Sequence, residues 1–320
     1  MKRTGWLLSA LALLMAVLFA ADVCLGSVDI PLRQVVQALF GSGVDARTRT
    51  IVIDLRLVKA ATALLAGIAL SVSGLQMQTL FRNPLAGPYV LGLSSGASLG
   101  VALLLLAGVG SSSGIAAAAM AGAAAVMGLL LIINERVRNV MTLLILGILF
   151  SSAIGSVVQI LQFMSHEQAL KSYVVWTMGS LSEVTAPQLG ILGGCVAAGL
   201  LLSVVTAKPL NLLELGEVFA RSAGVDLRRS RLAILASTTL LAGSVTAFCG
   251  PIGFIGMAMP HIARTLTGAS DHRVLLGASA LVGACVLIGC DIIARRYLIP
   301  INAVTSLAGI PVVIYVVIKK

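Results

Sequence analysis

The chain has 320 residues, of which 58% are hydrophobic and 11% are charged. Soluble domains average about 25% charged residues, so this composition excludes a water-soluble core as the main architecture. The net charge of +10 does not indicate a nucleic-acid partner, because most basic residues fall in short segments between apolar stretches, as the positive-inside rule expects. The 33 glycines suit close helix contact in lipid, and an aromatic content of 4% argues against a membrane β-barrel.

The first apolar run follows Met1-Lys2-Arg3 and ends near Leu25. A cleaved signal peptide has this charged-then-apolar shape. The run is nevertheless about as long as a membrane span, and Asp22 spoils the small-residue cleavage site. We therefore favour a retained first helix, with the signal peptide as the alternative.

Taking about 20 apolar residues as one crossing, the rest of the chain continues the pattern to ten spans. The boundary at Gly250-Pro251 breaks a helix, and a half-helix or re-entrant turn is the alternative there. The predicted fold is an all-α membrane protein with one transmembrane domain over 1–320. Its spans are expected at 6–25, 57–80, 90–108, 114–133, 140–164, 188–206, 231–249, 252–266, 274–294 and 303–318.

The basic residues predict the orientation of these spans. With the N-terminus inside, fourteen Lys and Arg residues fall on the inner side and eight on the outer side. This excess predicts that both termini are cytoplasmic, and an even number of spans agrees because it places both termini on the same side. The inner set is Lys2, Arg3, Arg82, Arg136, Arg138, Lys208, Arg221, Arg228, Arg229, Arg231, Arg264, Arg273, Lys319 and Lys320. The outer set is Arg33, Arg47, Arg49, Arg56, Lys59, Lys171, Arg295 and Arg296.

A short internal match suggests two halves. Leu65-Ala66-Gly67 is followed by Gly74, and Leu241-Ala242-Gly243 is followed by Gly250 at the same spacing. The two blocks lie in spans expected to run in opposite directions. Five spans repeated in inverted topology, as in many transporters, would produce this arrangement.

The longest inner segment, at 207–230, predicts short helices. Asn211 and Glu214 resemble a capping box, Gly224 supplies a left-handed stop, and a second turn can begin at Asp226. An apolar face is expected at Leu212, Leu215, Phe219 and Ala223. An interfacial helix on the inner leaflet and a docking helix for a cytoplasmic partner both remain open.

Several blocks, in order from about residue 50 to the C-terminus, resemble the signature of FecCD-type permeases of bacterial importers for iron–siderophores, haem and cobalamin. The blocks are Arg82-Asn83-Pro84-Leu85-Ala86, Leu91-Gly92-Leu93-Ser94-Ser95-Gly96-Ala97, Trp176-Thr177-Met178-Gly179-Ser180-Leu181, the run 215–225, the run 250–264 and Asp271-His272-Arg273-Val274-Leu275-Leu276.

The resemblance implies a homodimeric type II importer permease in the bacterial inner membrane, with ten spans per subunit. Two ATP-binding-cassette subunits would dock inside, and a periplasmic binding protein would dock outside. It implies that the helices at 207–230 couple to the ATPase, with Glu217, Ala220, Arg221 and Gly224 on the matching motif.

The resemblance also implies a docking role for basic residues on the outer side. Arg56-Leu57-Val58-Lys59 is similar to the family's Arg-Leu-Pro-Arg, whose basic residues receive acidic groups of the binding protein. Arg295, with Arg296 beside it, matches a further docking position. Lys59 keeps the charge but loses the two-pronged geometry of arginine. Anchoring at the lipid interface is the alternative role.

Four amides lie at helical spacing in the second and fifth spans: Gln76, Gln78, Gln159 and Gln162. Amides in a bundle can simply bond neighbouring helices. In the family the fifth span borders the pathway, which makes Gln159 and Gln162 the better lining candidates.

Asp291 is the acid expected at membrane depth, where an ionisable group suggests a proton relay. We expect it to pair with Arg295, one helical turn away. The five cysteines and three histidines show no metal-ligand spacing, so we expect neither a metal nor a cofactor on this chain.

The leading interpretation is therefore a permease subunit without enzymatic activity. The chain lacks the Gly-x-x-x-x-Gly-Lys-Ser/Thr motif, so ATP and Mg²⁺ would be used by a partner ATPase. The alternative is an ion-coupled secondary transporter that uses Asp291 and buried amides. The sequence does not determine which chelate is carried.

Overall fold

The computed structural model describes residues 2–26, 28–41, 43–108, 114–134 and 140–318. No strand occurs within these ranges, as the all-α prediction requires. Six residues of the charge count lie outside the described side chains: Lys2, Arg3, Arg136, Arg138, Lys319 and Lys320. The helices are α1 Lys2–Cys24, α2 Leu32–Phe40, α3 Ala46–Thr50, η1 Ile51–Leu57, α4 Val58–Leu80, α5 Leu93–Leu105, α6 Ile115–Asn134, α7 Val140–Met164, α8 Glu167–Thr177, α9 Ala186–Glu214, α10 Glu217–Ser222, α11 Leu227–Thr238, η3 Thr239–Gly243, α12 Ser244–Cys249, α13 Ile255–Thr267, α14 His272–Tyr297 and α15 Ile301–Ile318.

Helix occupies all ten predicted segments, and in the described ranges seven helical stretches are long and apolar enough to cross a membrane. The other three predicted segments hold α4, α5 and α13, which are not among these seven. α5 and α13 have 13 residues each, or about 20 Å of helix, which is less than the roughly 30 Å of hydrocarbon. Each is entered through an N-cap residue with positive φ, Gly92 at 79° and Phe254 at 65°.

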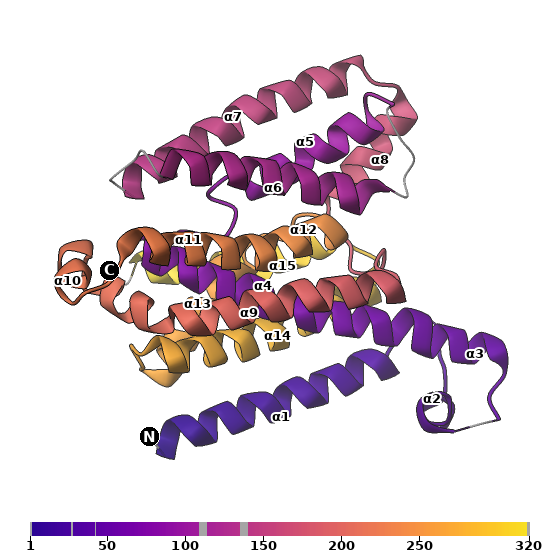
Figure 1. Ribbon diagram of the computed structural model, residues 1–320. Helices are drawn as coiled ribbons and strands as arrows, with labels where there is room; N and C mark the ends of the chain where they lie inside the picture. The colour runs from indigo at the N-terminus through magenta and orange to yellow at the C-terminus, as the bar shows by residue number, and fades with distance from the viewer. Residues whose placement is uncertain (1, 27, 42, 109–113, 135–139, 319–320) are drawn as a thin grey trace.

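α4 forms the centre of the bundle, between α9, α13 and α14 (Figure 1). Small residues allow this close approach. A Cβ atom on Gly74 would lie 1.7 Å from the carbonyl oxygen of Gly256, and one on Gly67 would lie 2.4 Å from that of Gly283. Both positions therefore require glycine for packing, and backbone contact replaces hydrophobic attraction between helices.

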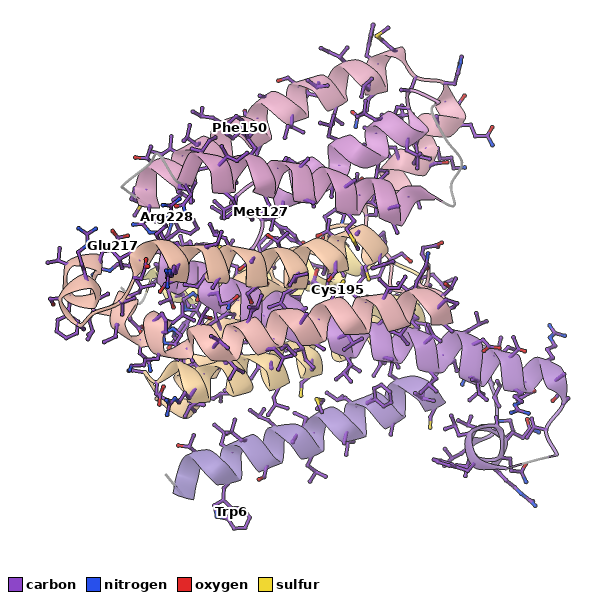
Figure 2. All side chains as sticks on the ribbon, in the orientation of Figure 1. Trp6, Met127, Phe150, Cys195, Glu217 and Arg228 are labelled. Carbon is purple, nitrogen blue, oxygen red and sulfur yellow. The ribbon has the colours of Figure 1, made fainter. Side chains whose placement is uncertain are left out.

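The first predicted span folds as α1, a peripheral helix that packs on α14. Its outward face is apolar, and Trp6 points away from the bundle (Figure 2). The two termini lie at the same end of the molecule as α10 (Figure 1). The start of α11 lies at the same end, so the 207–230 segment with its basic residues lies near the termini.

The capping-box prediction for the inner segment is wrong. α9 begins at Ala186 with a capping box of Thr185 and Gln188, and it continues through Pro209 to Glu214. Asn211 and Glu214 therefore lie in the last turn of a long helix, and their side chains contact other elements. Gly216, at φ 115°, ends this helix and starts α10.

Candidate functional site

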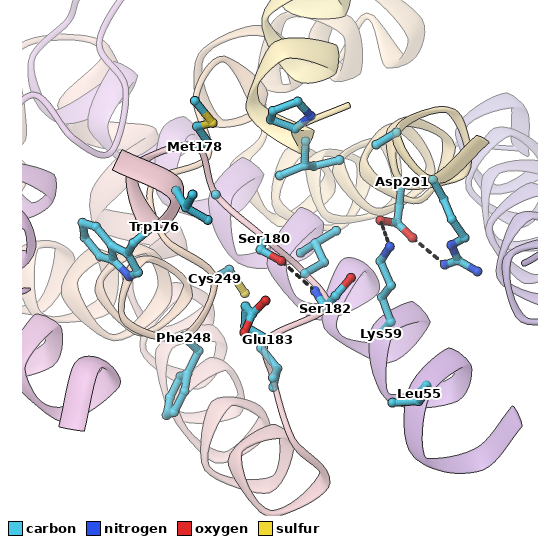
Figure 3. Close-up of a pocket in the computed structure, with 18 of the residues that line it drawn as sticks. Leu55, Lys59, Trp176, Met178, Ser180, Ser182, Glu183, Phe248, Cys249 and Asp291 are labelled. Atoms are coloured by element: carbon cyan, nitrogen blue, oxygen red, sulfur yellow. Dashed lines mark hydrogen bonds and ion pairs between the residues drawn. The ribbon is translucent and has the colours of Figure 1, made fainter. Parts of the chain in front are cut away.

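A cavity of about 1250 Å³ lies at the end of the bundle opposite α10. Its wall combines α8, the segment 178–184, α12, the start of α4 and the end of α14. Figure 3 shows Trp176, Met178 and Phe248 on one side and Ser180, Ser182 and Glu183 beside them. Apolar and hydroxyl groups line this part of the chamber, and charged side chains, among them Lys59, Asp291 and Arg295, line its border.

Two of the motif blocks meet in this wall. The backbone N–H of Ser180 donates to the carbonyl of Cys249 at 2.7 Å. Gly179 and Gly250 both have φ 73°, and a Cβ atom on Gly250 would lie 2.5 Å from the carbonyl oxygen of Trp176. The glycines of both blocks are thus explained by one close crossing of two backbone segments.

A buried group of ion pairs borders the cavity. Lys59 Nζ lies 3.1 Å from Asp291 Oδ1, and Arg295 Nη2 lies 2.6 Å from Asp291 Oδ2. The same Arg295 nitrogen lies 2.8 Å from Asp22 Oδ1. We call Asp22, Lys59, Asp291 and Arg295 the ion-pair cluster. It joins α1, α4 and α14, and it confirms the expected pairing of Asp291 with Arg295.

Arg56 and Arg295 also bind the end of α1. Arg56 Nη1 donates to the carbonyl of Cys24 at 2.8 Å, and Arg295 Nη1 donates to that of Leu25 at 2.7 Å. These carbonyls are the orphan acceptors at a helix C-terminus, where cations are favourable. The arginines therefore hold the last turn of α1 against the bundle.

The predicted docking residues Arg56, Lys59 and Arg295 are thus turned inward in this structure. Arg56 is buried, and the side chain of Arg295 is 12% exposed. Arg296, on the next position of α14, is exposed. From the sequence alone, Asp22 is expected only to oppose cleavage of a signal peptide. An acid at the end of an apolar helix was the signal that could have placed it in the cluster.

At the opposite end, α10 projects from the bundle (Figure 1). Glu217 Oε1 accepts from Arg231 Nη2 at 2.6 Å, which ties α10 to α11. Ala220 is the buried residue of α10, and Arg221 is exposed. Gly224 has φ 83°, which confirms the left-handed stop. Asp226 caps α11 by accepting from the backbone N–H of Arg229, as expected.

The predicted apolar face of the inner segment is divided between two helices. Leu212 belongs to α9, whereas Leu215, Val218 and Phe219 are exposed around the start of α10, with Val218 at 87%. We call these three residues the apolar tip. The break at Gly216 turns them outward, which continuous helical spacing did not predict.

Polar contacts fix the base of α10. Asn211 Oδ1 accepts from the backbone N–H of His272 at 2.7 Å, and Glu214 accepts from Arg264 at 2.8 Å. His272 also contacts the hydroxyl of Thr79 at 2.8 Å through Nε2. Hydrogen bonds from Asn211 and from the backbone N–H of Arg273 lower the pKa of Asp271, which caps α14. α9, α13 and α14 are thereby joined directly below the apolar tip.

The four amides separate into two kinds. Gln76 bonds Thr206 and Thr238, and Gln78 donates to the carbonyl of Met257 at 2.8 Å, so both hold helices together. Gln162 bonds the Tyr173 hydroxyl. Gln159 is exposed on α7.

Gln159 continues a polar row on the open face of α7. Ser152 and Ser156 are also exposed, at positions i−7 and i−3 from Gln159. Residues at this spacing lie on one helix face. These serines were not singled out from the sequence, although the same spacing was available as a signal.

No set of three or more His, Cys, Asp or Glu side chains that could hold a metal is found in the described part of the chain. His261 contacts the carbonyl of Pro84 at 2.6 Å, so it links two motif blocks. Asp291 carries an ion pair on each carboxylate oxygen, which leaves the proton-relay alternative without a free carboxylate at this position.

Residues 13–319 match the FecCD transport family. The chain belongs to this family. It is 32% identical to the hemin transport system permease HmuU of Yersinia pestis, over 98% of this chain and 96% of the relative. It is 35% identical to the vitamin B12 import system permease BtuC of Klebsiella pneumoniae, over 100% of this chain and 95% of the relative.

The fold agrees with that of a solved ABC transporter. A solved metal-chelate type ABC transporter in an inward-facing conformation superposes with a TM-score of 0.86 at 28% identity. The match covers 99% of this chain and 100% of that chain. The family places the chain among transport permeases, and the resemblance seen in its motifs is confirmed.

Proposed function

We propose that this FecCD-family chain is the membrane-spanning subunit of an ATP-driven importer for haem, cobalamin or ferric–siderophore complexes. The relatives named for hemin and vitamin B12 support this substrate class. Two copies would form the pathway in the bacterial inner membrane. Each copy would cross the membrane ten times, with both termini in the cytoplasm. The polar row ending at Gln159 on the open face of α7 would line that pathway, with Gln162 supporting it from behind.

The fold supports an inverted five-plus-five repeat. In both proposed halves a helical stretch of 23 residues is followed by an irregular turn and a 13-residue helix: α4 precedes α5, and the continuous stretch of α11, η3 and α12 precedes α13. The pairs α4–α14 and α6–α12 are both in contact. In each pair, the helix before the short helix of one half packs on the helix after the short helix of the other half. Two related halves that pack against each other would produce both pairs.

The observation that carries the coupling proposal is the projecting α10 with its apolar tip. Exposure of Val218 and Phe219 to water is unfavourable without a partner. The polar contacts below them join the end of α9, from which α10 continues, to α13 and α14, and the Glu217–Arg231 pair ties α10 to α11. Two ATPase subunits, which would bind ATP and Mg²⁺, would cover this tip. Glu217, Ala220, Arg221 and Gly224 would shape the contact.

At the other end, a periplasmic binding protein would dock over the cavity and release its chelate into it. Arg56, Lys59 and Arg295 remain the proposed docking cations. In this structure they bind internal acceptors, so acidic groups of the binding protein would compete with Asp22 and Asp291 for Lys59 and Arg295, and with backbone carbonyls for Arg56.

The test is ATPase activity of the chain co-purified with its ATPase subunit in lipid, with and without loaded binding protein. Wild type should be stimulated, and Glu217→Arg should lose stimulation because it reverses one charge of the Glu217–Arg231 pair. The double variant Glu217→Arg with Arg231→Glu is the matched control, since it restores a pair of opposite charge. Recovery in the double variant would assign Glu217 to positioning α10. Failure of any ATPase subunit to co-purify would contradict the importer proposal.

A further inference from the structure

α2 carries apolar side chains on two neighbouring faces, and the bundle covers one of them. Val35 and Ala38 are buried in a small apolar cluster with Val23 of α1 and Val52 of η1. This cluster is separate from the main core of the bundle. It fixes α2 against the first membrane helix.

The second face is apolar but exposed. Leu32, Val36 and Phe40 follow one another at four-residue spacing, and Phe40 is 87% exposed. Residues at this spacing share one side of a helix. We call these three residues the α2 stripe.

The third face of α2 is polar. Arg33 and Gln34 are exposed, and Gln37 is half-buried. With about 100° between successive residues, Arg33 and Gln37 lie on the side away from Val35 and next to the stripe, and Gln34 lies between Gln37 and the buried Ala38. α2 therefore presents protein-facing, apolar and polar sectors, which is the pattern of a helix at a boundary between apolar and aqueous surroundings.

The orientation of α2 agrees with such a boundary. In Figure 1 α2 is seen nearly end-on, whereas α1 and α9 run across the view. α2 thus lies across the long axis of the bundle, parallel to the expected membrane plane. It sits beside the C-terminal end of α1, where Val17 and Leu25 are also exposed, so the stripe continues the outward apolar surface of a spanning helix.

We propose that α2 is an interfacial helix that binds phospholipid at the cavity end of the bundle. The α2 stripe would lie among the upper acyl chains, and Arg33, with its stem along the stripe, would reach the phosphate groups. The described cavity lining contains no residue of α2. α2 and α7 also lie on opposite sides of the molecule in Figure 1, so α2 is far from the face proposed for the second copy.

Lipid contact at α2 would stabilise the rim of the cavity. The chain enters α2 through Val28, whose carbonyl accepts from Arg56, and leaves it toward α3 and η1. Binding α2 to the membrane surface therefore fixes the segment that Arg56 holds. This inference depends on the membrane position of α1 and not on the identity of the cargo.

Tryptophan quenching by brominated phospholipid tests the proposal. Phe40→Trp places a reporter on the α2 stripe, and Gln34→Trp is the matched control on the polar face of the same helix. Both native residues are exposed, so neither change disturbs packing. Each full-length variant is reconstituted in phosphatidylcholine vesicles with or without bromine on the acyl chains, and the wild-type signal of Trp6 and Trp176 is subtracted.

The Phe40→Trp reporter should lose most of its emission in brominated lipid, and Gln34→Trp should instead be quenched by iodide in water. Equal response of the two reporters to bromine, or quenching of Phe40→Trp by iodide alone, would overturn the proposal. A response of Phe40→Trp to added binding protein without a response to bromine would assign the stripe to a protein partner and also overturn it. The ATPase assay above does not depend on either reporter.

Discussion

The two ends of this bundle use charge in opposite ways. At the cavity end, basic residues that suggested a docking surface are turned inward, where Lys59 and Arg295 meet Asp291 and Asp22. At the α10 end, ion pairs such as Glu217–Arg231 lie beneath a tip whose exposed surface is apolar. Buried ion pairs at the cavity end join α1, α4 and α14. At the other end, ion pairs fix the helices that carry the exposed hydrophobic side chains.

The difference shows that residue type does not determine which residues face a partner. A charge needs a partner when it is buried, so a basic residue can form an ion pair with a neighbouring helix and no longer face outward. A hydrophobic residue has no directional requirement and remains exposed where a glycine break turns it out of the bundle. The contrast predicts unequal effects of substitution at the two ends.

The largest expected effect is at the cavity end. Arg295→Met should lower the free energy of unfolding by about 3–5 kcal/mol, because it leaves Asp22 buried and removes one partner of Asp291. Thermal unfolding in one detergent measures the loss. Arg296→Met, at the next and exposed position, is the control and should change stability by less than about 0.5 kcal/mol. Equal effects of the two substitutions would show that the ion-pair cluster does not hold the helices.

A middle-sized effect is expected at the base of α10. His272→Leu should destabilise by about 1–3 kcal/mol, because Asn211 and Thr79 lose a buried hydrogen-bond partner. The same unfolding measurement applies. His166→Leu, at an exposed position near the cavity end, should have little effect. A stable His272→Leu protein would mean that α10 is attached by other contacts.

The smallest stability effect is expected at the apolar tip. Val218→Asp should change stability by less than about 0.5 kcal/mol, since Val218 is already exposed. It should nevertheless abolish stimulated ATPase activity, because a charge would enter the proposed apolar contact. Val218→Thr keeps the size of the side chain without adding a charge, so it is the control and should retain stimulation. Full activity of Val218→Asp would separate the tip from coupling.

Particular residues show how far sequence reasoning reached. Asp291 and Arg295 are four residues apart on one helix, and this local pair was predicted correctly. Asp22 is remote from both in sequence, so its place in the cluster depends on α1 packing against α14. Likewise, Gly224 acts through its own backbone and was read correctly, whereas Asn211 bonds α14 and was misread as a cap.

The sequence by itself determined the all-helical class, the positions of the apolar segments and the family, because these depend on composition, hydrophobic period and local motifs. The tertiary structure decided which charges turn inward, which amides bond helices and which hydrophobic residues remain exposed. Those outcomes depend on contacts between segments far apart in the chain. A single side chain does not encode its burial, and the neighbours that fold against it decide whether it needs a partner or offers a surface.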